Sequence, residues 1–165
     1  MAHYQSDQLT VLAGKIKDVK YGMFTTVDSA HVMTSRPLTS QQVDAQGQMW
    51  FFVSDEATYL NDLLTQPQVN VSFADTSANL YVSVSGRAST VRDRAKAEEL
   101  WNPMTKAFFP AGLDDPHLLL LKVDIDVAEY WDTPAGKMVQ MFEIAKAALT
   151  GTPPKNLAEH GEIRL

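Results

Sequence analysis

The segment VNVSFADTSANLYVSVSGRASTV, residues 69–91, decides the fold class. Residues 69–74 and 80–91 largely alternate apolar and polar side chains and are rich in β-branched residues, as is typical of half-buried strands. Residues 75–79 between them are turn formers. The segment therefore predicts an antiparallel hairpin, with Gly86 as a bulge in the longer strand.

Further strand patterns flank this hairpin on both sides. They cover residues 21–27, 30–35 and 48–53 before it, and residues 118–127, extended by 128–131, after it. Turn formers at 28–29 and 44–47 separate the first three patterns. Because the strands follow one another in hairpin order, without strict alternation of strand and helix, the chain is predicted to be an α+β protein with an antiparallel barrel of about six strands.

Helical patterns lie between and around the strands. We expect a helix over residues 6–16 capped by Ser6, a short helix that starts at Ser54 and ends before Pro67, a helix from Asp93 to Trp101 closed by Pro103, and a helix over 138–149. Residues 150–165 are predicted to be loop as far as 162. No repeat or linker divides the chain, so 1–165 is expected to be one domain with its core at about 6–135 and a C-terminal helix and tail at 136–165.

Composition and charge narrow the classes of partner. The net charge of -6 argues against affinity for polyanions, so nucleic acid is not an expected partner. No apolar run reaches the length of about 18 residues that a membrane-spanning helix requires, and the N-terminus does not resemble a secretory signal. We therefore expect a cytoplasmic protein without membrane contact.

Known catalytic motifs give no match. The four histidines are scattered, so no protein-bound metal is expected. No serine lies in a G-x-S-x-G elbow, and neither standard glycine-rich phosphate loop occurs. If the chain is an enzyme, a bound cofactor is expected to supply its reactivity, and no catalytic residue is assigned.

An ordered set of motifs resembles the general stress protein family of the pyridoxamine 5'-phosphate oxidase-like FMN-binding split barrels. The motifs are SRPL at 35–38, GQMWFFV at 47–53, VSVSGRA at 82–88, WNP at 101–103, FFP at 108–110, DDP at 114–116 and EYWD at 129–132. They span about residues 6–135 in the family's order. The resemblance implies a six-stranded antiparallel split β-barrel with flanking helices, which forms a homodimer and holds FMN in a cleft at the subunit interface.

The resemblance also suggests which residues bind the cofactor. Ser35 and Arg36 offer a hydroxyl and a guanidinium to a phosphate or to the polar edge of the flavin, although Arg36 can equally be an exposed partner of a carboxylate. The backbone of residues 50–53 would run along the ring, while their side chains, with Trp50 and Phe52 on one face and Phe51 and Val53 on the other, fill the barrel. Trp101 either approaches the cleft or closes the apolar face of its own helix. The full set is Ser35, Arg36, Pro37, Leu38, Trp50, Phe51, Phe52, Val53, Thr58, Tyr59 and Trp101.

One departure from the family concerns the phosphate. The family pattern carries a Ser or Thr and, two residues later, a Lys that binds the FMN phosphate, whereas residues 56–61 read EATYLN. Thr58 and Tyr59 can still donate hydroxyl hydrogen bonds. The sequence therefore predicts weaker FMN binding, or a different flavin or a deazaflavin in its place.

The resulting functional hypothesis is an FMN-binding general stress protein that acts as a flavin-dependent oxidoreductase on an undefined substrate. Two alternatives stay open at this point. One is a flavin-binding stress protein without turnover, and the other is a split-barrel interaction module that has lost the cofactor.

Overall fold

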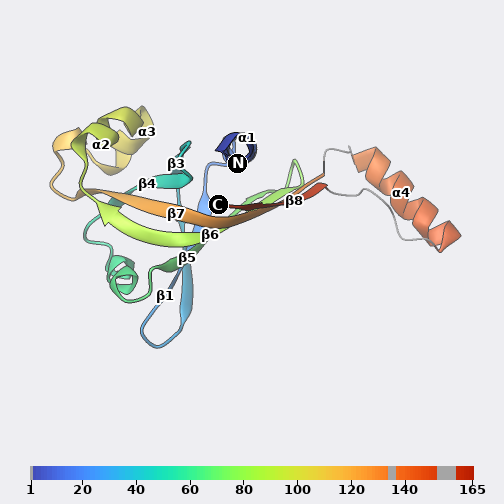
Figure 1. Ribbon diagram of the computed structural model, residues 1–165, viewed down its shortest axis with the longest axis horizontal. Helices are drawn as coiled ribbons and strands as arrows, with labels where there is room; N and C mark the ends of the chain where they lie inside the picture. Colours follow the sequence, from blue (N-terminus) through green and yellow to red (C-terminus); the bar gives the residue numbers. More distant parts are fainter. Residues whose placement is uncertain (1, 134–136, 152–158) are drawn as a thin grey trace.

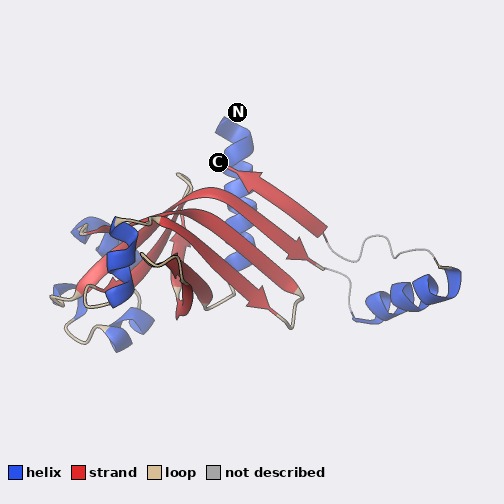
Figure 2. Cartoon of the chain, turned by 90° about the horizontal axis from the view of Figure 1, so that it is seen from below, coloured by secondary structure: helices blue, strands red, loops and turns tan. Residues whose placement is uncertain are grey.

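The structure is a computed structural model that describes residues 2–133, 137–151 and 159–165. In these residues, eight strands form one antiparallel, strongly curled sheet (Figures 1 and 2). The strands are β1 (Gly22–Val27), β2 (Met33–Leu38), β3 (Ser40–Val43), β4 (Gln48–Ser54), β5 (Gln68–Asp75), β6 (Leu80–Val91), β7 (Leu118–Asp132) and β8 (Glu159–Arg164). The helices are α1 (Ala2–Ile16), the 3-10 helix η1 (Thr58–Leu64), α2 (Arg94–Leu100), α3 (Pro103–Phe108), the 3-10 turn η2 (Gly112–Asp114) and α4 (Lys137–Thr150).

The sheet has the order β2-β1-β5-β6-β7-β4-β3, and β8 pairs with β7. The first part of β7 pairs with β4, from Leu118 opposite Ser54, and its last part pairs with β8. Helices α2 and α3 lie together at one end of the sheet, whereas α4 lies beyond its other end (Figure 1). The arrangement confirms the split-barrel fold class.

The bulge in the long hairpin strand lies where the sequence predicts it. The register between β6 and β7 shifts between Ser85 and Gly86. A Cβ atom on Gly86 would lie 2.2 Å from the carbonyl oxygen of Asp124, so the close approach of the two backbones requires glycine at this position.

Strand β4 contributes to two clusters of buried side chains, as its alternation predicts. Phe51 and Val53 belong to the main core, and Phe51 meets Phe24 edge to face with ring centroids 6.0 Å apart. Trp50 belongs to a second cluster with Leu100 of α2, against which Phe52 packs. One strand therefore supports both the barrel interior and the helical cover beside it.

The strand boundaries differ from the expectation in three places. β2 covers 33–38 instead of 30–35, because the Asp28 carboxylate accepts hydrogen bonds from the amides of Ala30 and Val32 and holds a longer turn, in which His31 has a φ of 61°. β3 and β8 raise the number of strands in the described part of the chain from the expected six to eight. β8 begins at Glu159, where loop was predicted.

The helices differ from the expectation at three points. α1 begins at Ala2, so Ser6 lies inside this helix and does not cap it. Ser54 ends β4 and does not cap a helix: η1 begins at Thr58 and has Ala57 at its N-cap position. Pro103 begins a further helix, α3, shortly after α2 ends, and the sequence did not predict this helix. The cap of α2 by Asp93 is confirmed, since its side chain accepts a hydrogen bond from the amide of Lys96 at 2.9 Å. The helix expected over 138–149 is α4.

Candidate functional site

A cavity of about 690 Å³ opens between the barrel and its helical cover. Its wall combines the end of β2, the end of β4, η1, α3 and the residues that precede β7. The lining is mostly apolar, with aromatic rings from Tyr21, Phe52, Tyr59, Phe108 and Phe109. Its charged members are Glu56, Asp115 and His117. A ligand with a flat, largely apolar body suits such a wall.

Asn102 fixes α3 over this cavity. Its Oδ1 accepts hydrogen bonds from the amides of Met104 at 3.0 Å and Thr105 at 3.2 Å, which caps the helix. Its Nδ2 donates to Oε1 of Gln41 of β3 at 2.7 Å. One side chain therefore joins the helical cover to the sheet.

Five of the predicted cofactor-binding residues line the cavity: Pro37, Leu38, Phe52, Val53 and Tyr59. They come from η1 and from β2 and β4, which lie toward opposite ends of the sheet order and meet at the cavity because the sheet curls (Figure 2). β3 pairs with β4 only as far as Phe51. Within the described sheet, the edge of β4 at residues 52–54 thus has no strand partner on the β3 side, and its backbone can bind a ligand.

Arg36 and Ser35 lie outside the cavity wall. Arg36 donates to the hydroxyls of Thr26 at 2.8 Å and Thr34 at 2.6 Å, and its guanidinium carbon lies 4.4 Å from the centre of the Tyr59 ring. Burial lowers the pKa of Arg36 and raises the pKa of Tyr59. Arg36 therefore supports the cavity through Tyr59. The hydroxyl of Ser35 is 2.7 Å from that of Thr25, on the exposed side of β2.

Four other predicted residues also lie outside the wall. Trp50 donates from Nε1 to Oδ2 of Asp44 at 2.8 Å, and Phe51 is fully buried in the main core. Thr58 is exposed at the start of η1. Trp101 ends α2 and contacts Phe52 edge to face with centroids 5.8 Å apart, so it reaches the cavity only through that ring.

Several cavity residues were absent from the predicted set. Asn102, Phe108, Phe109 and Asp115 belong to motifs that the sequence carries, but none of them was assigned to the cofactor. His117 follows one of these motifs directly. The pairing of β7 with β4 brings His117 to the end of β4, whereas Asn102, Phe108 and Phe109 reach the cavity with α3.

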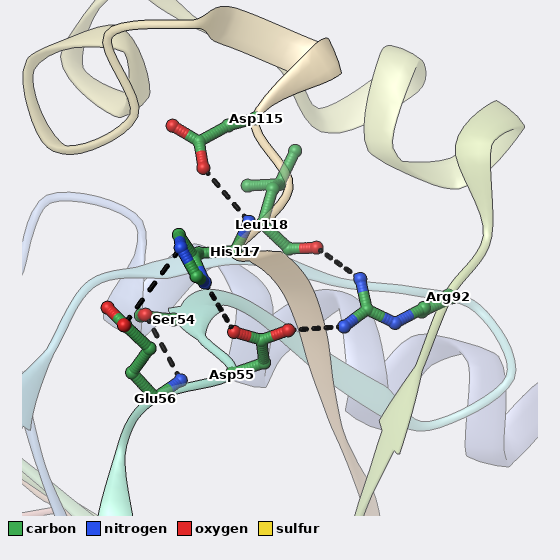
Figure 3. Close-up of polar contacts among 7 residues, drawn as sticks. All are labelled: Ser54, Asp55, Glu56, Arg92, Asp115, His117 and Leu118. Carbon is green, nitrogen blue, oxygen red and sulfur yellow. Dashed lines mark hydrogen bonds and ion pairs between the residues drawn. The ribbon is translucent and has the colours of Figure 1, made fainter.

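A polar cluster lies at the edge of the cavity (Figure 3). Nδ1 of His117 is 2.9 Å from Oδ1 of Asp55, and Nη2 of Arg92 donates to Oδ2 of the same carboxylate. The hydrogen bond with Asp55, followed by the charge of Glu56, raises the pKa of His117. The hydrogen bonds from His117 and then Arg92 lower the pKa of Asp55. This cluster stabilises the protonated form of His117 beside the cavity.

The comparison with protein families agrees with this geometry. The family described as "Pyridoxamine 5'-phosphate oxidase like" matches residues 7–155. The chain belongs to the pyridoxamine 5'-phosphate oxidase-like family. The match includes every strand of the barrel except β8 and every residue of the cavity wall.

Individual relatives within and around this family have similar lengths and folds. A general stress protein 26 from Jannaschia sp. CCS1 has a TM-score of 0.76 and 25% identity over 96% of this chain and 99% of its own. The general stress FMN/FAD binding protein from Xanthomonas citri has a TM-score of 0.66 and 27% identity over 82% of this chain and 93% of its own. Protein bli-3 of Neurospora crassa is 28% identical in an alignment of 144 residues that covers 81% of this chain and 69% of that protein.

Membrane-spanning helices and clusters of metal ligands are both absent from the described residues. None of the described helices combines the length and the apolar content needed to cross a membrane. Among the same residues, no three His, Asp or Glu side chains gather as metal ligands would.

Proposed function

We propose that this pyridoxamine 5'-phosphate oxidase-like chain binds FMN in the cavity and acts as a flavin-dependent oxidoreductase. One observation carries the proposal: Pro37 and Leu38 of the SRPL motif and Phe52 and Val53 of the GQMWFFV motif converge on a single, mostly apolar cavity. A relative that is 27% identical, the general stress FMN/FAD binding protein, supports a flavin as the ligand.

The cavity wall fits the ring system of a flavin. Leu38 and Phe52 offer apolar contact, the unpaired edge of β4 offers backbone groups to the polar rim of the ring, and Tyr59 offers a hydroxyl. A bound flavin supplies hydride-transfer chemistry, which the protein side chains cannot provide. The protein's part is to bind the ring, orient it and exclude water.

The cavity wall offers fewer favourable contacts to the FMN phosphate than to the ring. Among the described residues of the cavity wall there is no lysine or arginine, and Glu56 stands in the wall as a carboxylate. A missing charge-assisted hydrogen bond costs about 1.5 to 3 kcal/mol, or roughly ten- to a hundredfold in affinity. This feature keeps three alternatives open: another flavin or a deazaflavin, a flavin-binding protein without turnover, and a module that has lost the cofactor.

We further propose that the protein is a cytoplasmic homodimer. Tyr21, Met23, Tyr81 and Trp131 are between 38% and 54% exposed, and all four line a second hollow on the sheet. Large apolar side chains that lie together on a surface favour an interface with another protein surface. Tyr21 also lines the cavity, so a partner subunit seated there would lie next to the ligand.

A titration of cofactor-free protein with FMN, followed by flavin fluorescence, tests the proposed ligand. Phe108 is 71% exposed and lines the cavity, so Phe108→Asp places a carboxylate beside the anionic ligand without opening the core. Leu64→Asp is the matched control, because Leu64 is 83% exposed and lies outside the wall. We expect micromolar binding that weakens about tenfold in Phe108→Asp only. Folded protein that binds no FMN would overturn the assignment.

A further inference from the structure

A histidine lines the cavity with its ring held by a carboxylate (Figure 3). His117 Nδ1 lies 2.9 Å from Asp55 Oδ1. Asp55 Oδ2 accepts a hydrogen bond from Arg92, and Arg92 Nη1 donates to the carbonyl oxygen of Leu118 at 3.3 Å. The carboxylate is thus fixed from two sides, and it fixes the orientation of the imidazole in turn.

The backbone holds the same two residues together. The amide of Asp55 donates to the carbonyl oxygen of His117 at 3.0 Å, and the amide of His117 donates to Oδ1 of Asp115 at 3.0 Å. With Nδ1 engaged by Asp55, the remaining ring nitrogen is Nε2. Its nearest acidic neighbour, Oε1 of Glu56, is 3.9 Å away, beyond hydrogen-bond distance. The Nε2 proton can therefore be donated to a ligand.

The charges around the His117 ring suit a role as proton donor better than a role in binding an anion. Asp55, Glu56 and Asp115 raise the pKa of His117, the hydrogen bond with Asp55 having the largest effect. The neighbouring cation, Arg92, points at Asp55 (Figure 3) and is not among the residues that line the cavity. An anionic ligand group would meet Glu56 and Asp115 in the wall, whereas a neutral acceptor oxygen would meet an imidazolium.

We propose that His117, positioned by Asp55, donates a proton from Nε2 to a neutral conjugated carbonyl compound while that compound is reduced in the cavity. The proton goes to an oxygen atom of the compound. Quinones are the simplest class of such compounds. The aromatic rings of Phe52, Phe108 and Phe109 provide a wall for a flat acceptor. Asp55 is the positioning residue and His117 the proton donor. The redox half of this inference rests on the proposed function.

The step balances with a quinone as acceptor. The quinone would receive a hydride, which carries two electrons and one proton, from the anionic form of the reduced flavin, and it would receive the second proton from protonated His117. The products are the hydroquinone, oxidised flavin and neutral imidazole. The His117 side chain is 50% exposed, so water can return its proton before the next turnover.

The first test needs no flavin. The histidine Cε1 proton signals are followed by NMR against pH in the wild type and in Asp55→Asn. His160→Gln is the matched control, because His160 also lies near a carboxylate, Glu129 at 3.4 Å, but does not line the cavity. We expect His117 to titrate above pH 6.5, Asp55→Asn to lower its pKa, and the quinone menadione to shift its signal at saturation. His160→Gln should change none of these results.

The second test measures the proton transfer itself. FMN-loaded protein is reduced by light without oxygen and mixed with menadione in a stopped-flow instrument. Since a general acid typically contributes at least about a hundredfold, His117→Gln should slow flavin reoxidation on the order of a hundredfold. The wild-type rate should fall as pH rises through the pKa of His117, and the variant should lose this dependence. The rates of His117→Gln are compared at saturating FMN, and the rates of His160→Gln should match the wild type.

The outcomes separate this inference from the proposed function. Reoxidation of His117→Gln within twofold of the wild-type rate, with an unchanged pH profile, would overturn the proton-donor role while FMN binding stands. If the chain binds no FMN, the proposed function fails, and the NMR titration alone decides on His117. A His117 signal that menadione does not move, or a pKa that Asp55→Asn does not lower, then contradicts the inference.

Discussion

Glu56 is the residue whose charge most directly opposes an anionic ligand in the cavity. It lines the wall near the start of η1, and its side chain is 72% exposed, so its carboxylate is well solvated. A solvated carboxylate a few ångströms from a phosphate repels it weakly, whereas an ammonium group at the same place would donate a charge-assisted hydrogen bond.

Glu56→Lys is therefore expected to tighten FMN binding. Restoring one such hydrogen bond and removing the repulsion should lower the dissociation constant at least about tenfold, which corresponds to about 1.4 kcal/mol. Fluorescence titration measures the effect, and the gain should shrink as salt is added. Glu98→Lys makes the same change of charge on α2, outside the cavity wall, and should leave the affinity unchanged. Equal affinities of all three proteins would place the phosphate elsewhere.

A sequence pattern predicts the positions of some cavity residues and not the partners of others. Phe52 and Val53 lie in an alternating apolar strand, so both their strand and their faces follow from the sequence. The contacts of Arg36 do not follow from the sequence, because Thr26 and Tyr59 come near it only through the register of β1 against β2 and the placement of η1. His117 meets Asp55 only because β7 pairs with β4.

Among the elements, α3 connects the helical cover with the sheet through one residue. Asn102 caps α3 and at the same time donates to Gln41 of β3, which also lines the cavity. Asp93 caps α2 in the same manner but does not line the cavity. The chain thus contains two helix caps of similar chemistry, of which one is part of the proposed binding site.

Replacing each cap by alanine separates stability from binding. Asn102→Ala and Asp93→Ala should each lower the free energy of unfolding by about 1 kcal/mol, measured by urea denaturation. Only Asn102→Ala should also weaken FMN binding, since α3 loses its link to Gln41. Similar loss of affinity in both variants would mean that general destabilisation, and not the position of α3, controls binding.

β3 and β8 were not predicted, and the physical reason is the same for both. β3 reads SQQV, a polar sequence with low strand propensity, and it becomes a strand because β4 offers a free edge. β8 likewise reads EHGEIR, yet pairs with the last part of β7. Strongly patterned elements such as β5 and β6 agree with the prediction, because their apolar faces lie in the core.

At the scale of the whole molecule, the outer face of the sheet carries apolar side chains that one chain leaves partly exposed. Tyr81 is 42% exposed, and Trp131 is 38% exposed and stacks on His160 with centroids 5.2 Å apart. The hollow that both residues line has a volume of about 410 Å³. A second copy of the chain seated on this face would cover these side chains.

Tyr81→Asp is expected to convert the proposed dimer to a monomer. A carboxylate on each side of a symmetric interface would be desolvated and would face an apolar surface, which costs several kcal/mol. Light scattering coupled to gel filtration measures the mass, and Leu64→Asp, at an exposed position outside this hollow, should leave it unchanged. A wild-type chain that is monomeric at tens of micromolar would contradict the homodimer.

The most direct test of the central claim, that FMN occupies the cavity, is a map of the backbone amide shifts that FMN causes in a ¹H–¹⁵N NMR titration. We expect the largest shifts at Leu38 and Thr39, at Phe52 to Ser54, at Tyr59 and along α3, with little change in α1. Shifts centred instead on Met23, Tyr81 and Trp131, or no shifts at saturating FMN, would contradict it.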